Sequence, residues 1–320
     1  MVIGVFILLY IGLGFLIDLI INAEKYPQAP LGVISQALAT GHLIPYATFI
    51  TTGIAIISLW VTYAFYDKLM LLGVEYHEVT ATNAKNLLEK QLYNTIEEMQ
   101  VAAGLKYTPR VFIIEANYMN AFASGYSEKS AMVAITRGLL EKLDRAEIQA
   151  VMAHELSHIR HLDIKLTLTA SVLANLTLIV IDVLFYGVLF GGGRRGRERE
   201  GGNWLLIAIV ILRYLLPLIT VLLMLFLSRT REYMADAGAV ELMRDNEPLA
   251  RALLKIQNDY DGHQSEYADD YRRTPHEQVR REAYIFDPTT AGISPKQASS
   301  DFFSTHPNIL KRLAAIGFNK

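Results

Sequence analysis

Four long hydrophobic runs constrain this chain more than any other feature of its sequence. They cover residues 2–21, 43–66, 166–190 and 204–228 of the 320. An α-helix needs about 20 apolar residues to cross the roughly 30 Å hydrocarbon core of a bilayer, and each run has that length. Only 19% of all residues are charged, below the roughly 25% that is usual in soluble domains. The runs therefore predict a membrane protein with four hydrophobic helices.

The runs divide the chain into four parts. Residues 1–66 hold the first two runs, and residues 166–228 hold the other two, joined by a Gly- and Arg-rich linker at 191–202. The remaining parts, 67–165 and 229–320, have the composition of a folded soluble domain. Together these two parts are long enough to form one hydrophobic core.

Local patterns predict a helix over residues 83–103, strands over 111–116 and 131–136, and a loop-rich region over 258–301. A further helix is expected to begin after Asp144, a good N-cap. No Gly or Pro separates that helix from the third hydrophobic run, so we expect it to continue unbroken into the run. Asp18, near the end of the first run, is expected to reach the membrane interface, and no function is assigned to it.

The stretch His154-Glu155-Leu156-Ser157-His158 carries the clearest chemical signal. Residues four apart on a helix lie on the same face, so both imidazoles can point at one metal ion. This is the H-E-x-x-H pattern of zinc hydrolases, in which the glutamate takes a proton from the attacking water. The competing interpretation is a polar patch on a surface helix.

A catalytic zinc keeps three protein ligands, so two histidines require a third. The pattern H-E-x-x-H-x-x-G-x-x-H is excluded, because position 161 is His161 and position 164 is Ile164. Glu232 is the better candidate, since it begins a predicted helix. Asp236 follows one turn later and could hydrogen-bond a ligating imidazole.

The chain also resembles a known family. HELSHIRHLD, SRTREYMAD and FSTHPNILKR, with NAFASG upstream and hydrophobic segments between them, are similar to the motifs of HtpX-type membrane zinc endopeptidases. The resemblance covers essentially the whole chain. It implies an α+β membrane protein in which a small β-sheet packs on the H-E-x-x-H helix, with one zinc ion per chain. It further implies a bacterial inner-membrane location, a cytoplasmic active site, and misfolded membrane proteins or unfolded polypeptides as substrates.

The resemblance assigns roles to the metal-site residues by position. His154, His158 and Glu232 would bind zinc, and Glu155 would be the general base and later the proton donor. Asp236 would support one of the ligands from outside the metal's coordination sphere.

The resemblance also assigns roles on the substrate side. His306 would approach the scissile carbonyl, with Arg312 supporting it. Asn308 follows His306-Pro307 where relatives often have a second proline, which is a departure from the pattern. An edge strand receiving the substrate backbone would include or adjoin Asn120, Ala121, Phe122, Ala123, Ser124 and Gly125.

Two other functional classes compete with the peptidase. An inactive membrane scaffold or chaperone would be expected to lack part of the catalytic set, yet the set is complete. A transporter could use Asp182 and Arg213 inside the hydrophobic runs, but the sequence has no repeat symmetry. The net charge of −2 gives no reason to expect nucleic-acid binding, and the absence of cysteine excludes disulfides and thiolate metal sites.

The orientation in the membrane does not follow from charge alone. Four arginines in the linker 191–202 favour a cytoplasmic linker by the positive-inside rule, but basic residues beside the runs on the catalytic side nearly balance them. We follow the resemblance and expect a cytoplasmic catalytic face. An unbroken helix from His158 to Leu166 would place the zinc roughly 12 Å above the hydrocarbon, at about 1.5 Å per residue. This geometry predicts cleavage in loops and juxtamembrane segments.

Overall fold

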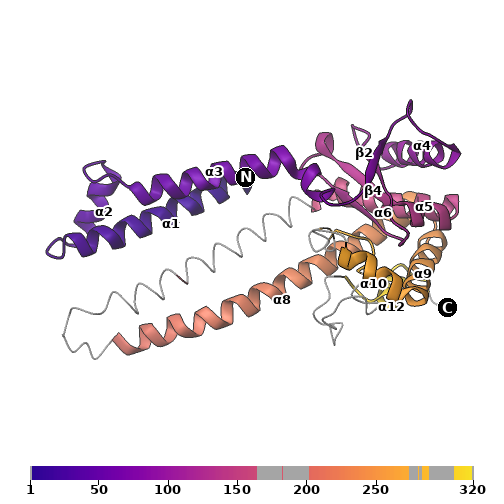
Figure 1. Ribbon diagram of the computed structural model, residues 1–320. Coiled ribbons are helices and arrows are strands. Elements are labelled where there is room, and N and C mark those ends of the chain that lie inside the picture. The colour runs from indigo at the N-terminus through magenta and orange to yellow at the C-terminus, as the bar shows by residue number, and fades with distance from the viewer. Residues whose placement is uncertain are drawn as a thin grey trace. The chain divides into compact units, whose positions relative to one another are not determined.

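The computed structural model of the chain (Figure 1) describes residues 2–163, 182, 202–273, 280, 283–287 and 306–318. The chain divides into two compact units, each built from two segments: Met1–Ala64 with Leu168–Met224, and Phe65–Thr167 with Leu225–Lys320. Apart from Asp182, the predicted hydrophobic run 166–190 lies outside the described residues, as does the linker 191–202 except for Gly202.

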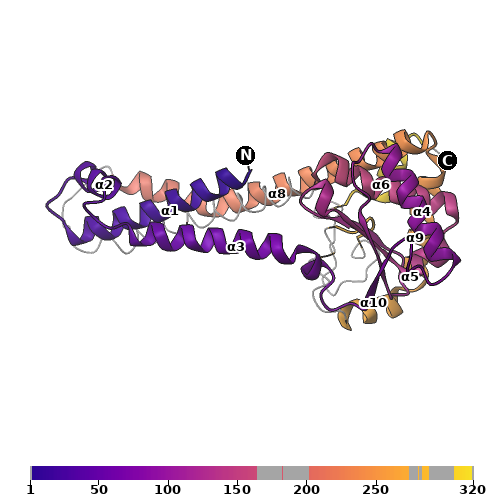
Figure 2. The ribbon, with the colours of Figure 1, turned by 90° about the horizontal axis from the view of Figure 1, so that it is seen from above.

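Helices dominate the first unit. They are α1 (Val2–Lys25), α2 (Leu31–Ala39), the larger part of α3 (Tyr46–Met70) and the first part of α8 (Gly202–Met243). Helices α1 and α3 run side by side, with α2 in the connection between them (Figures 1 and 2). Helix α2 was not predicted; Ile34 and Leu38, one turn apart, give it a buried face.

Asp18 joins α1 to α3. Its carboxylate is buried and accepts hydrogen bonds from the backbone amides of Ala47 and Thr48, at 2.9 and 2.8 Å, and from the Thr48 hydroxyl at 2.8 Å. The first amides of a helix lack partners within it, and its dipole favours a negative charge there. Asp18 is therefore a cap for α3 supplied by another helix, a structural role that was not predicted, and its place relative to a membrane interface stays a prediction. Gly14 permits the contact, because a Cβ there would collide with Thr48 and Thr51.

The two charged residues considered for a transporter pair with each other. Arg213 Nη2 lies 3.2 Å from Asp182 Oδ1. Such pairing lowers the cost of placing charged groups in apolar surroundings. Among the helices of the described residues, none is both long enough and apolar enough to cross a membrane.

The second unit contains a four-stranded mixed sheet in the order β1-β2-β4-β3. Its strands are β1 (Tyr76–Val79), β2 (Arg110–Ile114), β3 (Ala121–Ser124) and β4 (Met132–Thr136). Strands β2 and β4 are parallel, while the pairs β1–β2 and β3–β4 are antiparallel. The strands predicted at 111–116 and 131–136 are β2 and β4; β1 was not predicted. Strand β3 is an edge of the sheet, and the 3₁₀ helix η1 (Glu128–Ser130) connects it to β4.

Helices surround this sheet. They are α4 (Leu87–Ala102), α5 (Arg137–Lys142), α6 (Arg145–His161), the last part of α8, α9 (Glu247–Gly262), α10 (Gln264–Arg273) and α12 (Ile309–Ala315). Helix α6, which carries the H-E-x-x-H stretch, packs against β3, α4 and α9 (Figure 2). The prediction of a small sheet packed on this helix is confirmed. Helices α9 and α10 occupy part of a region that was predicted to be loop-rich.

Helix α6 begins and ends at identifiable signals. Asp144 caps its first turn and forms a reciprocal capping box with Glu147. The helix ends at His161, because Leu162 adopts the left-handed conformation with φ 55° and ψ 35°. The expectation that α6 continues unbroken toward the third hydrophobic run is therefore wrong. The estimate of the zinc's height above the hydrocarbon depended on that continuity and loses its basis.

Candidate metal centre

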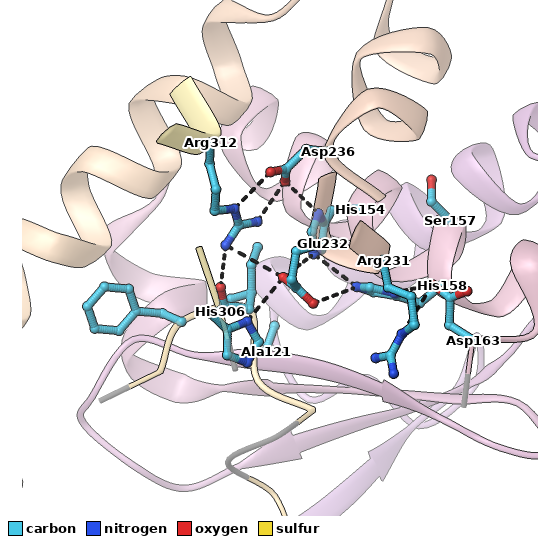
Figure 3. Close-up of polar contacts among 12 residues, drawn as sticks. Ala121, His154, Ser157, His158, Asp163, Arg231, Glu232, Asp236, His306 and Arg312 are labelled. Carbon is cyan, nitrogen blue, oxygen red and sulfur yellow. Dashed lines mark hydrogen bonds and ion pairs between the residues drawn. The ribbon is translucent and has the colours of Figure 1, made fainter. Parts of the chain in front are cut away.

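Helix α6 brings two imidazoles together, as its four-residue spacing requires. The Nε2 atoms of His154 and His158 are 3.2 Å apart, and the two ring planes are nearly perpendicular (Figure 3). Both side chains are buried, on a helix whose neighbouring residues form the core of the second unit. Rigid packing on both sides fixes the direction in which these rings point.

Helix α8 adds a carboxylate to the pair. Glu232 places Oε2 3.7 Å from His154 Nε2 and Oε1 3.6 Å from His158 Nε2. Helix α8 can approach α6 this closely because residue 238 is glycine: a Cβ there would lie 2.5 Å from Ser157 Oγ. One donor atom from each of the three side chains lies within 4.8 Å of the others, so the group could hold a metal ion.

Each imidazole has a carboxylate behind it. His154 Nδ1 is 2.9 Å from Asp236 Oδ1, and His158 Nδ1 is 2.8 Å from Asp163 Oδ2 (Figure 3). When Nδ1 donates its proton to a carboxylate, the Nε2 lone pair is left for a metal. Both Nε2 atoms face Glu232, so the tautomer and the direction of each ring suit metal binding.

Asp163 was not among the predicted site residues. It lies in the motif HELSHIRHLD, but five helical residues correspond to about 140° around the axis from His158, which argues against contact. Contact arises only because the helix ends and Leu162 is left-handed. The acidic residue shortly after the second histidine was the available signal.

Arg312 lies behind the other carboxylate. Its Nε and Nη2 donate to the two oxygens of Asp236 at 2.8 and 2.6 Å, and Nη1 donates to the Ile285 carbonyl at 2.6 Å. Nη1 is also 3.8 Å from Glu232 Oε2. Arg312 was expected to support His306, but its contacts are with Asp236, Glu232 and the backbone of Ile285. His306 itself places Nδ1 3.2 Å from Glu232 Oε2.

Burial and charge pairing have opposite effects on the pKa values of Asp236 and Glu232. Burial alone would raise the pKa of Asp236, but the charge and hydrogen bonds of Arg312, together with His154, bring that pKa down to about 2. The pKa of Glu232 likewise lies well below its ordinary value, because His306, His158 and Arg312 outweigh the effect of burial. Both groups are therefore ionised at neutral pH.

The two imidazoles differ in their response to burial. Burial lowers the pKa of His154 despite the nearby Asp236. Burial would also lower the pKa of His158, but the hydrogen bond to Asp163 and the charge of Glu232 outweigh it, so that this pKa is raised. The neutral form of His154, which is the form that binds metals, is thus favoured by burial, and the charges of His158 and Arg312 act in the same direction.

Glu155 is a buried carboxyl group beside the three donors. Burial raises its pKa to about 8; the charge of Glu232 acts in the same direction, while His158 and the Ala123 backbone amide oppose it. Within the described residues, neither carboxylate oxygen makes a hydrogen bond of ordinary geometry. A buried carboxyl whose pKa lies near neutrality is suited to accept and return a proton.

The residues expected to bind a substrate backbone lie at strand β3, with Asn120 just before it and Gly125 just after it. The chain itself uses the beginning of this edge. The side chain of Asn120 forms two hydrogen bonds with the backbone of Phe286. Its Nδ2 donates to the Phe286 carbonyl at 2.9 Å, and its Oδ1 accepts from the Phe286 backbone N–H at 3.3 Å. The Ile285 amide donates to the Ala121 carbonyl at 2.9 Å. These long-range contacts were not predicted. They occupy the start of the β3 edge, so that substrate binding stays a prediction only for the edge from Ala123 onward.

The chain is similar to known proteins over most of its length. The profile described as "Peptidase family M48" matches residues 86–318. A "Protease HtpX homolog" of Helicobacter pylori (strain Shi470) is 37% identical over 316 residues, covering 98% of this chain and 93% of the relative. One from Listeria monocytogenes serotype 4a (strain HCC23) is 35% identical over 263 residues, covering 78% and 82%.

A solved structure shares the fold. The crystal structure of S. mikatae Ste24p matches with a TM-score of 0.52 at 18% identity, covering 95% of this chain and 62% of that one. At this identity the match concerns the fold alone, whereas the sequence matches concern the family. The chain belongs to peptidase family M48, and within it to the HtpX-type proteases.

Proposed function

We propose that the protein is a zinc-dependent endopeptidase whose metal is held by His154, His158 and Glu232. The observation that carries the proposal is the set of three separations between donor atoms, 3.2, 3.7 and 3.6 Å. A tetrahedral zinc with ligand distances of about 2.0–2.1 Å requires neighbouring donors about 3.3 Å apart. Two imidazoles and one carboxylate also form a ligand set of known catalytic zinc sites. The residues therefore fit this metal.

When bound, zinc would polarise the substrate carbonyl and activate a water molecule for attack. Glu155 takes the proton that the water loses as its oxygen adds to the carbonyl carbon. The same group then gives that proton to the amine nitrogen as the C–N bond breaks.

His306 is proposed to donate a hydrogen bond to the oxyanion that forms on the substrate carbonyl. It is 3% exposed, and its Nδ1 lies 3.2 Å from Glu232 Oε2, so that it stands beside a proposed zinc ligand. One oxyanion donor contributes about 10²–10³ to kcat, so His306→Ala should lower kcat by about that factor and leave zinc bound.

The buried position of the site favours an extended substrate. Even the most exposed of the three proposed ligands, His158, is only 8% exposed, so a folded domain could not present a peptide bond to the metal. Extended peptides bind by adding a strand to a sheet edge, and β3 is the nearby edge. Because Ile285 already pairs with Ala121, we propose that the substrate pairs with the later part of β3, at Ala123 to Gly125. Unfolded or misfolded polypeptides fit this requirement.

We further propose that the first unit holds the enzyme in a lipid bilayer and that its substrates include misfolded membrane proteins. The helices of this unit expose many large apolar side chains. These include Leu8, Ile11, Ile21, Phe49, Ile50, Ile54, Ile57, Trp60, Ile211, Leu215, Leu218 and Leu223. Apolar surface of this extent is costly in water and needs a cover, which lipid tails would provide. The expected orientation places the second unit on the cytoplasmic side of a bacterial inner membrane.

The experiment that tests the enzymatic proposal compares the wild-type chain with Glu155→Gln on an unfolded protein substrate in detergent. The amide cannot take a proton, so turnover should fall by roughly 10²–10⁴ while zinc content is unchanged. Glu241→Gln, which removes an exposed ion pair with Arg160, is a matched control that should cleave like wild type. Equal turnover by wild type and Glu155→Gln would contradict the mechanism, and no cleavage by either would favour a non-enzymatic scaffold.

A further inference from the structure

The carboxylate behind His158 is placed by an unusual backbone conformation. Helix α6 ends at His161, and Leu162 follows with φ 55°, a left-handed conformation that disfavours a residue with a Cβ. This turn brings Asp163 back toward the helix, where its side chain becomes buried. Strained positions of this kind persist where the surrounding structure requires them, frequently at functional sites.

The side chain of Asp163 has a specific partner. After the break at Leu162, Asp163 is again in a helical conformation, and its carboxylate lies 2.8 Å from His158 Nδ1. A buried carboxylate needs such a partner, and this one is a proposed zinc ligand.

Helix α8 supplies a positive charge to the same carboxylate. Arg231 Nε lies 3.9 Å from Asp163 Oδ2, and Arg231 is the residue immediately before Glu232. Asp163 thus contacts one proposed ligand and the neighbour of another. Its position connects the end of α6 to the part of α8 from which the carboxylate ligand projects.

We propose that Asp163 is a positioning residue for the metal centre, together with Arg231. Asp163 holds the Nδ1 proton of His158, so that Nε2 faces the metal with its lone pair, and Arg231 balances the buried negative charge. The inference rests on the proposed zinc site and adds to it a second carboxylate, comparable to Asp236 behind His154. Partners of this kind orient the ligand and raise its basicity.

Metal affinity of the full-length chain in detergent tests the inference. Zinc dissociation constants would be measured by competition with a chromophoric chelator for wild type, Asp163→Ala and Asp163→Asn. We expect Asp163→Ala to bind zinc about 10–100-fold more weakly. Asp163→Asn should recover part of this loss, because its amide oxygen can still accept the Nδ1 proton of His158. Glu241→Gln, which removes a different ion pair between α6 and α8, should keep the wild-type affinity.

Cobalt absorption provides a readout that a purely structural role would not change. Loosened ligation should shift the visible bands of the Co²⁺-substituted Asp163→Ala protein relative to wild type and to Glu241→Gln. If Asp163→Ala does not fold, Asp163→Asn carries the test, and its zinc affinity must still lie below that of wild type.

The results that overturn the inference are distinct from failure of the proposed function. Zinc affinity within about twofold of wild type in both Asp163 variants, even with a lower melting temperature, would reduce Asp163 to a structural role and leave the zinc site intact. A wild-type chain that binds no zinc would overturn the proposed function, and the inference with it.

Discussion

Each of the two histidines in the metal centre is held by a carboxylate, but the two carboxylates are placed differently. We call Asp236 with His154 one side of the centre and Asp163 with His158 the other. Behind His154, Asp236 projects from the interior of α8, one turn after the ligand Glu232. Arg312 donates a hydrogen bond to each carboxylate oxygen of Asp236. Behind His158, Asp163 lies beyond the end of α6 on a left-handed turn. Its arginine, Arg231, is 3.9 Å away rather than at hydrogen-bonding distance.

Asp236 and Asp163 are expected to contribute similarly to metal affinity but differently to the stability of the domain. A buried ion pair with two hydrogen bonds, such as Asp236 with Arg312, couples metal binding to the stability of the domain, because loss of either partner leaves a buried charge. The looser arrangement at Asp163 orients its imidazole with less influence on stability. The account therefore predicts that metal affinity depends on both sides and that stability depends mainly on the Asp236 side.

The largest expected effect comes from the ligand shared by both sides. Glu232→Ala should bind no zinc at concentrations that saturate the wild-type chain, because two imidazoles alone make a much weaker site. Elemental analysis after gel filtration, paired with a cleavage assay, measures this. Stoichiometric zinc in that variant would remove Glu232 from the ligand set and with it the basis of the comparison.

The next effect separates the two carboxylates. Asp236→Ala should weaken zinc binding about 10–100-fold, as is expected for Asp163→Ala. It should also destabilise the metal-free protein by about 3–5 kcal/mol, because Arg312 is left buried without its partner.

Chemical unfolding of the metal-free variants measures that difference. For Asp163→Ala we expect a clearly smaller loss, since Arg231 is farther from its partner. Equal losses of stability in the two variants would show that the two sides are equivalent and would contradict the comparison.

A pH effect is expected from Glu155, which follows the proposed ligand His154 on α6. In the metal-free protein its pKa is raised from 4.5 to about 8, so the folded state holds a proton that the unfolded state releases. The stability from this proton is fully present below about pH 4.5 and is lost as the pH rises through 8. Asp236 does the opposite, with a pKa lowered to about 2, and its contribution is constant above about pH 4.5.

Glu155→Gln keeps the group neutral at every pH. At pH 8 the metal-free variant should therefore be more stable than metal-free wild type, by on the order of a few kcal/mol at most, and the difference should shrink toward pH 5. Melting curves with a chelator at several pH values measure it. A difference independent of pH would contradict the assigned pKa.

The smallest effect concerns the turn at Leu162. Leu162→Gly relieves the cost of a left-handed leucine but adds backbone entropy to the unfolded chain, so stability should change by no more than about 1 kcal/mol. Zinc affinity should be retained because Asp163 stays in place. Leu162→Val, which is β-branched and tolerates this conformation poorly, should cost more stability. A larger loss for glycine than for valine would show that the turn is not strained as described.

The sequence predicted those parts of the site that depend on a helical period or a known motif. His154, Glu155 and His158 lie where the four-residue spacing places them, and Glu232 could be proposed because it follows a hydrophobic run. Asp163 could not be found in this way. Its contact with His158 depends on the left-handed conformation of Leu162, and leucine has no preference for that conformation.

Long-range pairing limited the predictions elsewhere. Asp18 was interpreted from its place in a hydrophobic run, yet its partners are amides about 30 residues later in the chain. Asn120 was assigned to substrate binding, and its amide bonds Phe286 on a segment more than 160 residues away. Local sequence patterns carry no information on such contacts, and so they arose only with the tertiary structure.

The central claim is that activity requires one metal ion held by three named side chains. The most direct measurement titrates zinc into the metal-free, full-length chain in detergent while following cleavage of an unfolded protein. The account predicts that activity is absent without metal, rises with added zinc and reaches its plateau at one zinc per chain, before any inhibition by excess. Full activity in the metal-free chain, or no activity after one equivalent of zinc is bound, would contradict it.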